Sequence, residues 1–149
     1  MKSRTNFFIS LGLLILIISV ASFTFFSRSQ KTAPTFPATI NRDCAPWDGA
    51  AFTLFIPIDQ GSSIYISIWQ EPDFGLPVTF HFPDETMQPG TATYVLQLSH
   101  SEQLTGKISF RNIVQGNLVD GSFDFVSDSG IQLKGKFEAR WGNEVVYCG

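Results

Sequence analysis

Charged residues are scarce in this chain of 149 residues, where Asp, Glu, Lys and Arg make up 15% against about 25% in an average soluble protein. Hydrophobic residues reach 44%, and 14% of the chain is Phe, Trp or Tyr. Such a composition excludes an intrinsically disordered chain, and the length fits one domain with a small appendage. The apolar surplus predicts a membrane segment, a β domain, or both, because aromatic side chains favour strands.

Acidic residues are absent from the first 31 positions, which contain four basic residues: Lys2, Arg4, Arg28 and Lys31. Positions 32–149 hold the other six basic residues and all 13 acidic ones, so their net charge is −7, while the whole chain carries −3. This asymmetry is typical of a membrane-targeted N-terminus followed by an exported domain. The absence of a strongly basic composition argues against a nucleic-acid partner.

Residues 7–26 contain no charge and have the sequence FFISLGLLILIISVASFTFF. A helix of this length spans about 30 Å at ~1.5 Å per residue, which matches the hydrocarbon core of a bilayer. We therefore predict a short basic tail (1–6) followed by a transmembrane helix that acts as a signal anchor. The alternative is a cleaved signal peptide, with Ser19-Val20-Ala21 as a small-x-small cleavage site. Because the segment stays apolar through Phe26, the uncleaved anchor is favoured.

The flanks of this segment predict its orientation. Two basic residues and the α-amino group precede it, and two basic residues follow it, so the positive-inside rule favours a cytoplasmic N-terminus by one charge. The chain is then a single-pass membrane protein whose C-terminal part is extracytoplasmic, in a periplasmic, lumenal or extracellular compartment. Residues 27–43 are polar and contain two prolines, which predicts an extended linker before a domain at 44–149.

Cysteine is nearly absent, and the two that occur, Cys44 and Cys148, bracket the predicted domain. In an exported chain this arrangement predicts a disulfide, and the alternative is a pair of buried free thiols. With the cysteines paired, the two histidines are too few ligands for a structural zinc site. We expect neither a metal nor a cofactor.

No stretch after residue 44 has helical periodicity, and the hydrophobic residues there fall in short runs separated by Gly, Pro and Asp. These runs predict strands at 51–58, 63–70, 77–82, 92–100, 104–114, 117–126, 131–141 and 144–148. The expected fold class is all-β: an antiparallel sandwich or a small barrel of about seven or eight strands.

The second half of the domain contains an internal repeat with an apolar residue, a glycine and further apolar residues at alternate positions. The three copies are Leu104-x-Gly106-x-Ile108-x-Phe110, Val119-x-Gly121-x-Phe123-x-Phe125 and Leu133-x-Gly135-x-Phe137-x-Ala139. The pattern resembles the meanders of calycin-type barrels and of many exported β-sandwiches. This is a likeness of architecture over about 40 residues, and it implies no function.

Two turns predict the register of this meander, one at Gln115-Gly116 and one at Asp128–Gly130. The register places Phe110 opposite Gly121, Phe125 opposite Gly106, Phe123 opposite Gly135 and Phe137 opposite Gly121, so that an aromatic ring covers each bare glycine backbone. It also places Lys107 opposite Asp124, Arg111 opposite Asp120 and Lys134 opposite Asp124. The alternating charges thereby gain a structural explanation as cross-strand pairs, and we do not interpret them as an anion site.

The first half of the domain differs, because the predicted strands 51–58 and 63–70 are apolar on both faces. Two outcomes are open for the second face. Tyr65 and Trp69 pack beneath the linker or the loops, or they join Phe74 in a contact surface for a protein or a glycan.

Catalytic motifs are missing from the sequence. A Ser–His–carboxylate triad could be assembled from Ser99, His81 and Asp84, but almost any sequence allows such a choice, and no nucleophile-elbow motif accompanies it. We therefore predict a protein that is not an enzyme. The first hypothesis is a membrane-anchored extracytoplasmic module that binds or assembles a protein or envelope polymer. The alternative is a small barrel that carries an apolar ligand among its meander Phe rings, at positions 110, 123, 125 and 137.

Overall fold

The computed structural model describes residues 33–72, 75, 77–84, 89–97, 100–143 and 145–148, all within the compact unit Ala33–Gly149. The predicted basic tail and transmembrane segment lie outside the described residues, as do Phe74 and Ser99. In the part that is described, no helix has the length and apolar character needed to cross a membrane.

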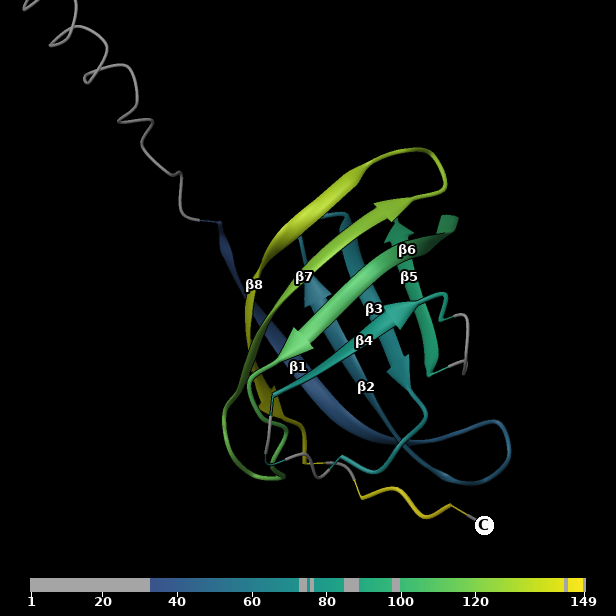
Figure 1. The fold of residues 1–149 in the computed structure, drawn as a ribbon, viewed down its shortest axis with the longest axis vertical. Coiled ribbons are helices and arrows are strands. Elements are labelled where there is room, and N and C mark those ends of the chain that lie inside the picture. Colours follow the sequence, from purple (N-terminus) through teal and green to yellow (C-terminus); the bar gives the residue numbers. More distant parts are fainter. Residues whose placement is uncertain are drawn as a thin grey trace, which may run out of the picture. The chain divides into compact units, whose positions relative to one another are not determined.

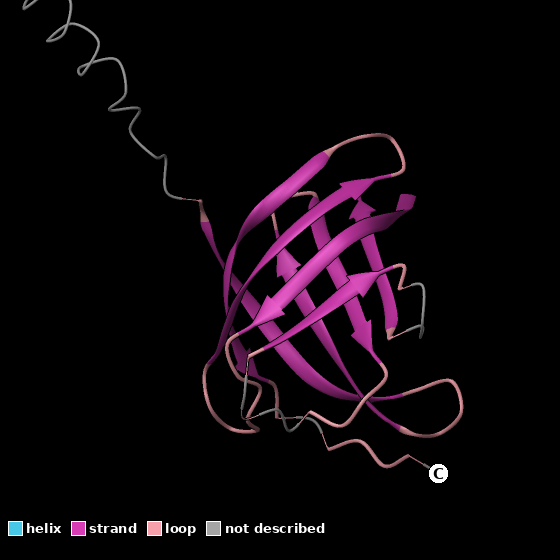
Figure 2. Ribbon diagram, in the orientation of Figure 1, coloured by secondary structure: helices cyan, strands magenta, loops and turns pink. Residues whose placement is uncertain are grey.

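Eight strands make up the fold: β1 (Thr35–Cys44), β2 (Ala50–Pro57), β3 (Ser62–Ile68), β4 (Val78–Phe82), β5 (Gly90–Leu96), β6 (His100–Phe110), β7 (Val119–Ser127) and β8 (Gln132–Trp141). Their order is β4-β6-β5-β3-β2-β1-β8-β7, and β6 also pairs with β7. Seven strands therefore close into a barrel, and β4 is an extra strand on β6 (Figure 1). The all-β prediction is confirmed, and of its two architectures the chain adopts the barrel (Figure 2).

The barrel closes through a parallel pair, in which Phe36 of β1 lies opposite Phe137 of β8 and Ile40 lies opposite Trp141. The other six neighbouring pairs in the ring are antiparallel. Strand direction must return to itself around a closed ring, so the number of antiparallel neighbours must be even. A ring of seven strands with antiparallel hairpins therefore needs one parallel pair, and β1 supplies it.

Strand β1 corrects the predicted domain boundary, because nine of its residues belong to the segment that the sequence analysis assigned to a linker, 27–43. The linker prediction relied on the two prolines of this segment, and a proline does not prevent a strand here. Pro37 is accommodated within β1, between the inward-facing Phe36 and Ala38, which pack against the core. The strand predicted at 144–148 is also wrong, since residues 145–148 have no regular structure.

The extra strand β4 arises because β6 changes partner along one edge. Its first part pairs with β5, from His100–Leu96 to Gln103–Thr93, and its last part pairs with β4, from Gly106–Phe82 to Phe110–Val78. The first three residues of β5 pair with β3 only. Strand β4 therefore replaces β5 as the hydrogen-bonded neighbour of β6 over the last part of β6.

The predicted register of the meander is confirmed at every position that defines it. Opposite one another lie Phe110 and Gly121, Phe125 and Gly106, Phe123 and Gly135, Phe137 and Gly121, and Lys107 and Asp124. On the outer face, Arg111 Nε lies 2.6 Å from Asp120 Oδ2, and Lys134 Nζ lies 2.6 Å from Asp124 Oδ2. Two of the three predicted charge pairs therefore form ion pairs, and the third, Lys107 and Asp124, is present as a register position.

Aromatic rings fill the interior of the barrel. Phe52, Phe110, Phe125 and Phe137 are fully buried. The ring centroids of Phe110 and Phe137 are 5.3 Å apart, those of Phe52 and Phe110 are 6.0 Å apart, and both pairs meet edge to face, the geometry that aromatic quadrupoles favour. The meander rings that a ligand carrier would place on a cavity wall are thus in contact with other rings of the core.

Glu102 joins β6 to the loop between β7 and β8. Its Oε2 accepts hydrogen bonds from the backbone N–H of Ser129 at 3.2 Å and from the Ser129 hydroxyl at 2.7 Å. The hydroxyls of Ser127 and Ser129 lower the pKa of Glu102 from 4.5 to about 2. A carboxyl with a depressed pKa in the folded state stabilises the fold above its ordinary pKa, and this contribution is lost as the pH falls from about 4.5 to about 2.

We expect Glu102→Gln to lower the melting temperature at pH 6, and we expect the difference from the unmodified chain to shrink as the pH is lowered towards 2. Melting followed by circular dichroism across this range is the measurement. Glu138→Gln, on the exposed face of β8, removes the same charge without these hydrogen bonds and serves as the control. A Glu102→Gln deficit that is equal at pH 6 and pH 2 would contradict the assigned role of the carboxylate.

Candidate functional site

Two aromatic side chains lie side by side on the outer face of the barrel. Phe55 of β2 is paired with Tyr65 of β3, and each is 41% exposed. Successive side chains on a strand point to opposite faces, and the neighbouring Leu54 and Ile64 are fully buried in the core. The alternation therefore directs Phe55 and Tyr65 outward, and their position as cross-strand partners makes them one continuous apolar surface.

Hydrogen-bonding groups border this pair. Thr39 of β1 lies opposite Phe55, and Thr93 of β5 lies opposite Tyr65, so a threonine flanks each ring across the sheet. Towards the β2–β3 turn, Phe55 borders an open pocket of about 390 Å³ that also includes Asp59. The Gly61 backbone N–H, which donates to Asp59 Oδ1 at 2.8 Å, lowers the pKa of that carboxyl. An apolar centre with a polar margin is the usual anatomy of a protein interface.

A second aromatic pair follows the end of β3. The rings of Trp47, in the β1–β2 loop, and Trp69 meet edge to face with centroids 5.5 Å apart. Trp47 is 63% exposed, whereas Trp69 is half-buried. The Trp69 backbone N–H donates to the carbonyl oxygen of Pro89 at 2.8 Å, which ties the end of β3 to the start of β5. Trp69 is thus partly a structural residue, and Trp47 presents most of the exposed ring area of this pair.

Of the three contact residues predicted from the sequence, Tyr65 is exposed, Trp69 is half-buried, and Phe74 lies outside the described residues. Phe55 and Trp47, the other members of the two aromatic pairs, are exposed and are not among the predicted residues. The signal for Phe55 is its outward position in a strand whose other face already fills the core. Trp47 lies in a turn, where periodicity gives no information.

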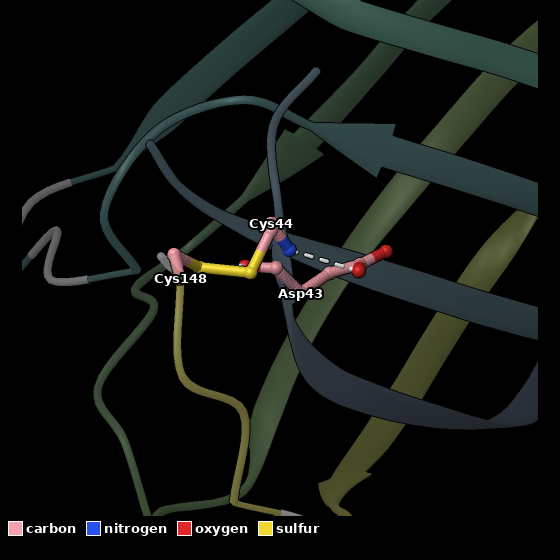
Figure 3. Close-up of a disulfide and its surroundings, with 3 residues drawn as sticks. All are labelled: Asp43, Cys44 and Cys148. Atoms are coloured by element: carbon pink, nitrogen blue, oxygen red, sulfur yellow. Dashed lines mark hydrogen bonds between the residues drawn. A yellow bond between two sulfur atoms is a disulfide. The ribbon is translucent and has the colours of Figure 1, made fainter. Parts of the chain in front are cut away.

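The predicted disulfide between Cys44 and Cys148 is confirmed, with the two Cα atoms 5.6 Å apart (Figure 3). It joins the end of β1 to the segment that follows β8. Tyr147, next to the bridge in sequence, is 89% exposed, and Trp47 follows Cys44 by three residues. The bridge therefore anchors two exposed aromatic side chains close to it in sequence.

Neither metal chemistry nor a triad emerges from the described residues. They contain no group of three or more His, Cys, Asp or Glu side chains that could hold a metal ion. His81 is exposed on β4 opposite Lys107, and Ser99 lies outside the described residues.

Comparison of the chain with protein-family models, with curated proteins and with solved structures finds no match.

Proposed function

We propose that this chain is a membrane-anchored extracytoplasmic module that binds a protein partner through the outer face of β2 and β3. The observation that carries the proposal is the exposed cross-strand pair Phe55–Tyr65. The uncharged run 7–26 is the proposed anchor, with its N-terminus cytoplasmic. The disulfide supports an extracytoplasmic position, because disulfides persist in oxidising compartments.

The distribution of exposed side chains over the described residues supports a contact role for this face. The exposed aromatic residues Trp47, Phe55, Tyr65 and Tyr147 come from the β1–β2 loop, β2, β3 and the segment after β8. The exposed large hydrophobics of the β6–β8 meander are aliphatic: Leu118, Val126 and Ile131. Tyr and Trp are enriched among the residues that dominate binding energy at interfaces. The exposed aromatic side chains of β2 and β3, without a counterpart among the described residues of the meander, thus favour this face as the contact surface.

A protein partner fits the Phe55–Tyr65 surface better than a polymer does. The surface is formed by two adjacent side chains on the convex outside of a barrel, bordered by threonine hydroxyls, and it suits a complementary apolar patch. An envelope polymer is the second candidate, favoured by one observation: Trp47 meets Trp69 edge to face and is largely exposed, as a sugar-stacking ring must be.

We expect the double substitution Phe55→Ser/Tyr65→Ser to reduce partner capture by the full-length protein at least tenfold, because aromatic anchors typically contribute about 2 kcal/mol or more. Capture from native membranes, quantified beside the melting temperature, is the measurement. Val126→Ser/Ile131→Ser is the matched control. Val126 of β7 and Ile131 of the β7–β8 loop are 41% and 40% exposed and lie outside β2 and β3.

Equal capture by the two double variants would refute the assigned surface. A loss of capture with Trp47→Ala alone, while Phe55→Ser/Tyr65→Ser captures normally, would transfer the role to the tryptophan pair and favour a polymer.

A further inference from the structure

A polar pocket of about 520 Å³ lies at the end of the barrel where β1 and β8 finish. The side chains that matter for its chemistry come from the end of β1, the β6–β7 loop and the end of β8: Arg42, Gln115, Asn117, Arg140, Trp141 and Asn143. Two guanidinium groups and three amides thus surround one space, and the described lining residues include no carboxylate. In a chain with a net charge of −3, this local excess of positive charge is distinctive.

Hydrogen bonds fix the walls of the pocket in place. The Trp141 indole N–H donates to the Val114 carbonyl oxygen at 3.0 Å, which fastens the β6–β7 loop to β8. The Gly142 backbone N–H donates to the Ile40 carbonyl oxygen at 2.9 Å. Arg42 Nη2 donates to Gln115 Oε1 at 2.5 Å, so the end of β1 is joined to the same loop. The lining groups are therefore held in position by the barrel.

Both arginines retain unused hydrogen-bonding capacity. Arg42 Nε is buried and has no hydrogen-bond partner. The Glu71 carboxylate lies 3.8 Å from Nη2 of this guanidinium and is largely exposed, which makes it a weak competitor. Among the described residues no ion pair involves Arg140. A buried donor without an acceptor is unfavourable, so the Arg42 guanidinium is incompletely satisfied by the chain itself.

We propose that this pocket binds an acidic sugar unit, with Arg42 and Arg140 contacting its anionic group and the amides of Asn117 and Asn143 contacting its hydroxyls. Guanidinium groups bind carboxylate and phosphate oxygens in bidentate fashion, and amides donate to and accept from hydroxyl groups. The volume lies within the range of small-molecule sites. The site is separate in its residues from the Phe55–Tyr65 surface and does not depend on the function proposed for that surface.

The test is an NMR titration of the full-length protein in detergent micelles, with the three tryptophan indole N–H signals as reporters. The probes are sodium glucuronate, glucose 6-phosphate and neutral glucose. We expect a saturable shift of the Trp141 signal with one or both anions and none with glucose, while the Trp47 and Trp69 signals stay unchanged. The anion that saturates at the lower concentration identifies carboxylate or phosphate as the preferred group.

Arg140→Gln should weaken this binding at least tenfold, because it removes one of the two guanidinium groups that contact the anionic group. Arg140 is exposed, so its loss should leave the fold unchanged. Lys136→Gln removes the same charge four residues earlier on β8 and should leave the affinity unchanged. A Trp141 signal that responds to neither anion overturns the proposal, and so does equal weakening by Arg140→Gln and Lys136→Gln. Either result leaves the capture experiment on Phe55 and Tyr65 unaffected, so the two proposals fail separately.

Discussion

Gly121→Val is expected to destabilise the barrel by about 3 kcal/mol, at the upper end of the usual cost of overpacking. Gly121 of β7 lies between Phe110 on β6 and Phe137 on β8. A Cβ atom here would overlap the backbone carbonyl oxygen of Ser109 and lie 2.7 Å from Cζ of Phe137. The Phe137 ring could turn aside only into a filled core, and the carbonyl oxygen belongs to the paired strand. The melting temperature should fall by roughly 10 °C or more.

Gly61→Val is the matched control for this substitution. Gly61 lies in the β2–β3 turn, where the nearest atoms to an added Cβ are Gln97 Cγ at 3.8 Å and Asp59 Oδ1 at 4.0 Å, both ordinary contact distances. We expect it to shift the melting temperature by less than a third as much. Equal shifts for the two valine variants would mean that the cost arises from valine itself rather than from the glycine–phenylalanine register.

The register of the meander could be predicted because its information is local. Each hairpin joins strands within about 15 residues of each other, and turn chemistry, glycine cover and opposed charges favour the same alignment. The parallel pairing of β1 with β8 could not be predicted, since it joins Thr35 to Lys136, about a hundred residues apart. No turn specifies such a contact, and only closure of the whole ring requires it.

The same distinction applies to the candidate sites. The exposed pair contains Tyr65, which strand alternation predicts, and Phe55, whose significance depends on knowing that β2 pairs with β3. The polar pocket was not predicted at all, because Arg42 and Arg140 are far apart in the sequence and meet only through the parallel closure. No motif links them. Sequence patterns therefore predicted one of the two residues in the site built within a hairpin and missed the site built by ring closure.

The double substitution Cys44→Ser/Cys148→Ser is expected to destabilise the domain by about 2–4 kcal/mol. The two cysteines are separated by 104 residues, so the bridge restricts nearly all of the unfolded domain. The folded barrel needs the bridge much less, because the parallel pairing already holds Ile40 beside Trp141 near the ends of β1 and β8. The effect should therefore appear as a lower urea midpoint for a barrel that still folds.

A second variant separates the unfolded-state effect from lost packing. A chain that ends at residue 143 and carries Cys44→Ser loses both the bridge and the last segment, in which Val145 and Tyr147 are 73% and 89% exposed. Side chains this exposed bury little apolar surface on the barrel. The urea midpoint of the truncated chain should therefore equal that of the double serine variant. A truncated chain that is clearly less stable would show that the segment packs on the barrel. The bridge would then stabilise the folded state as well as restricting the unfolded one.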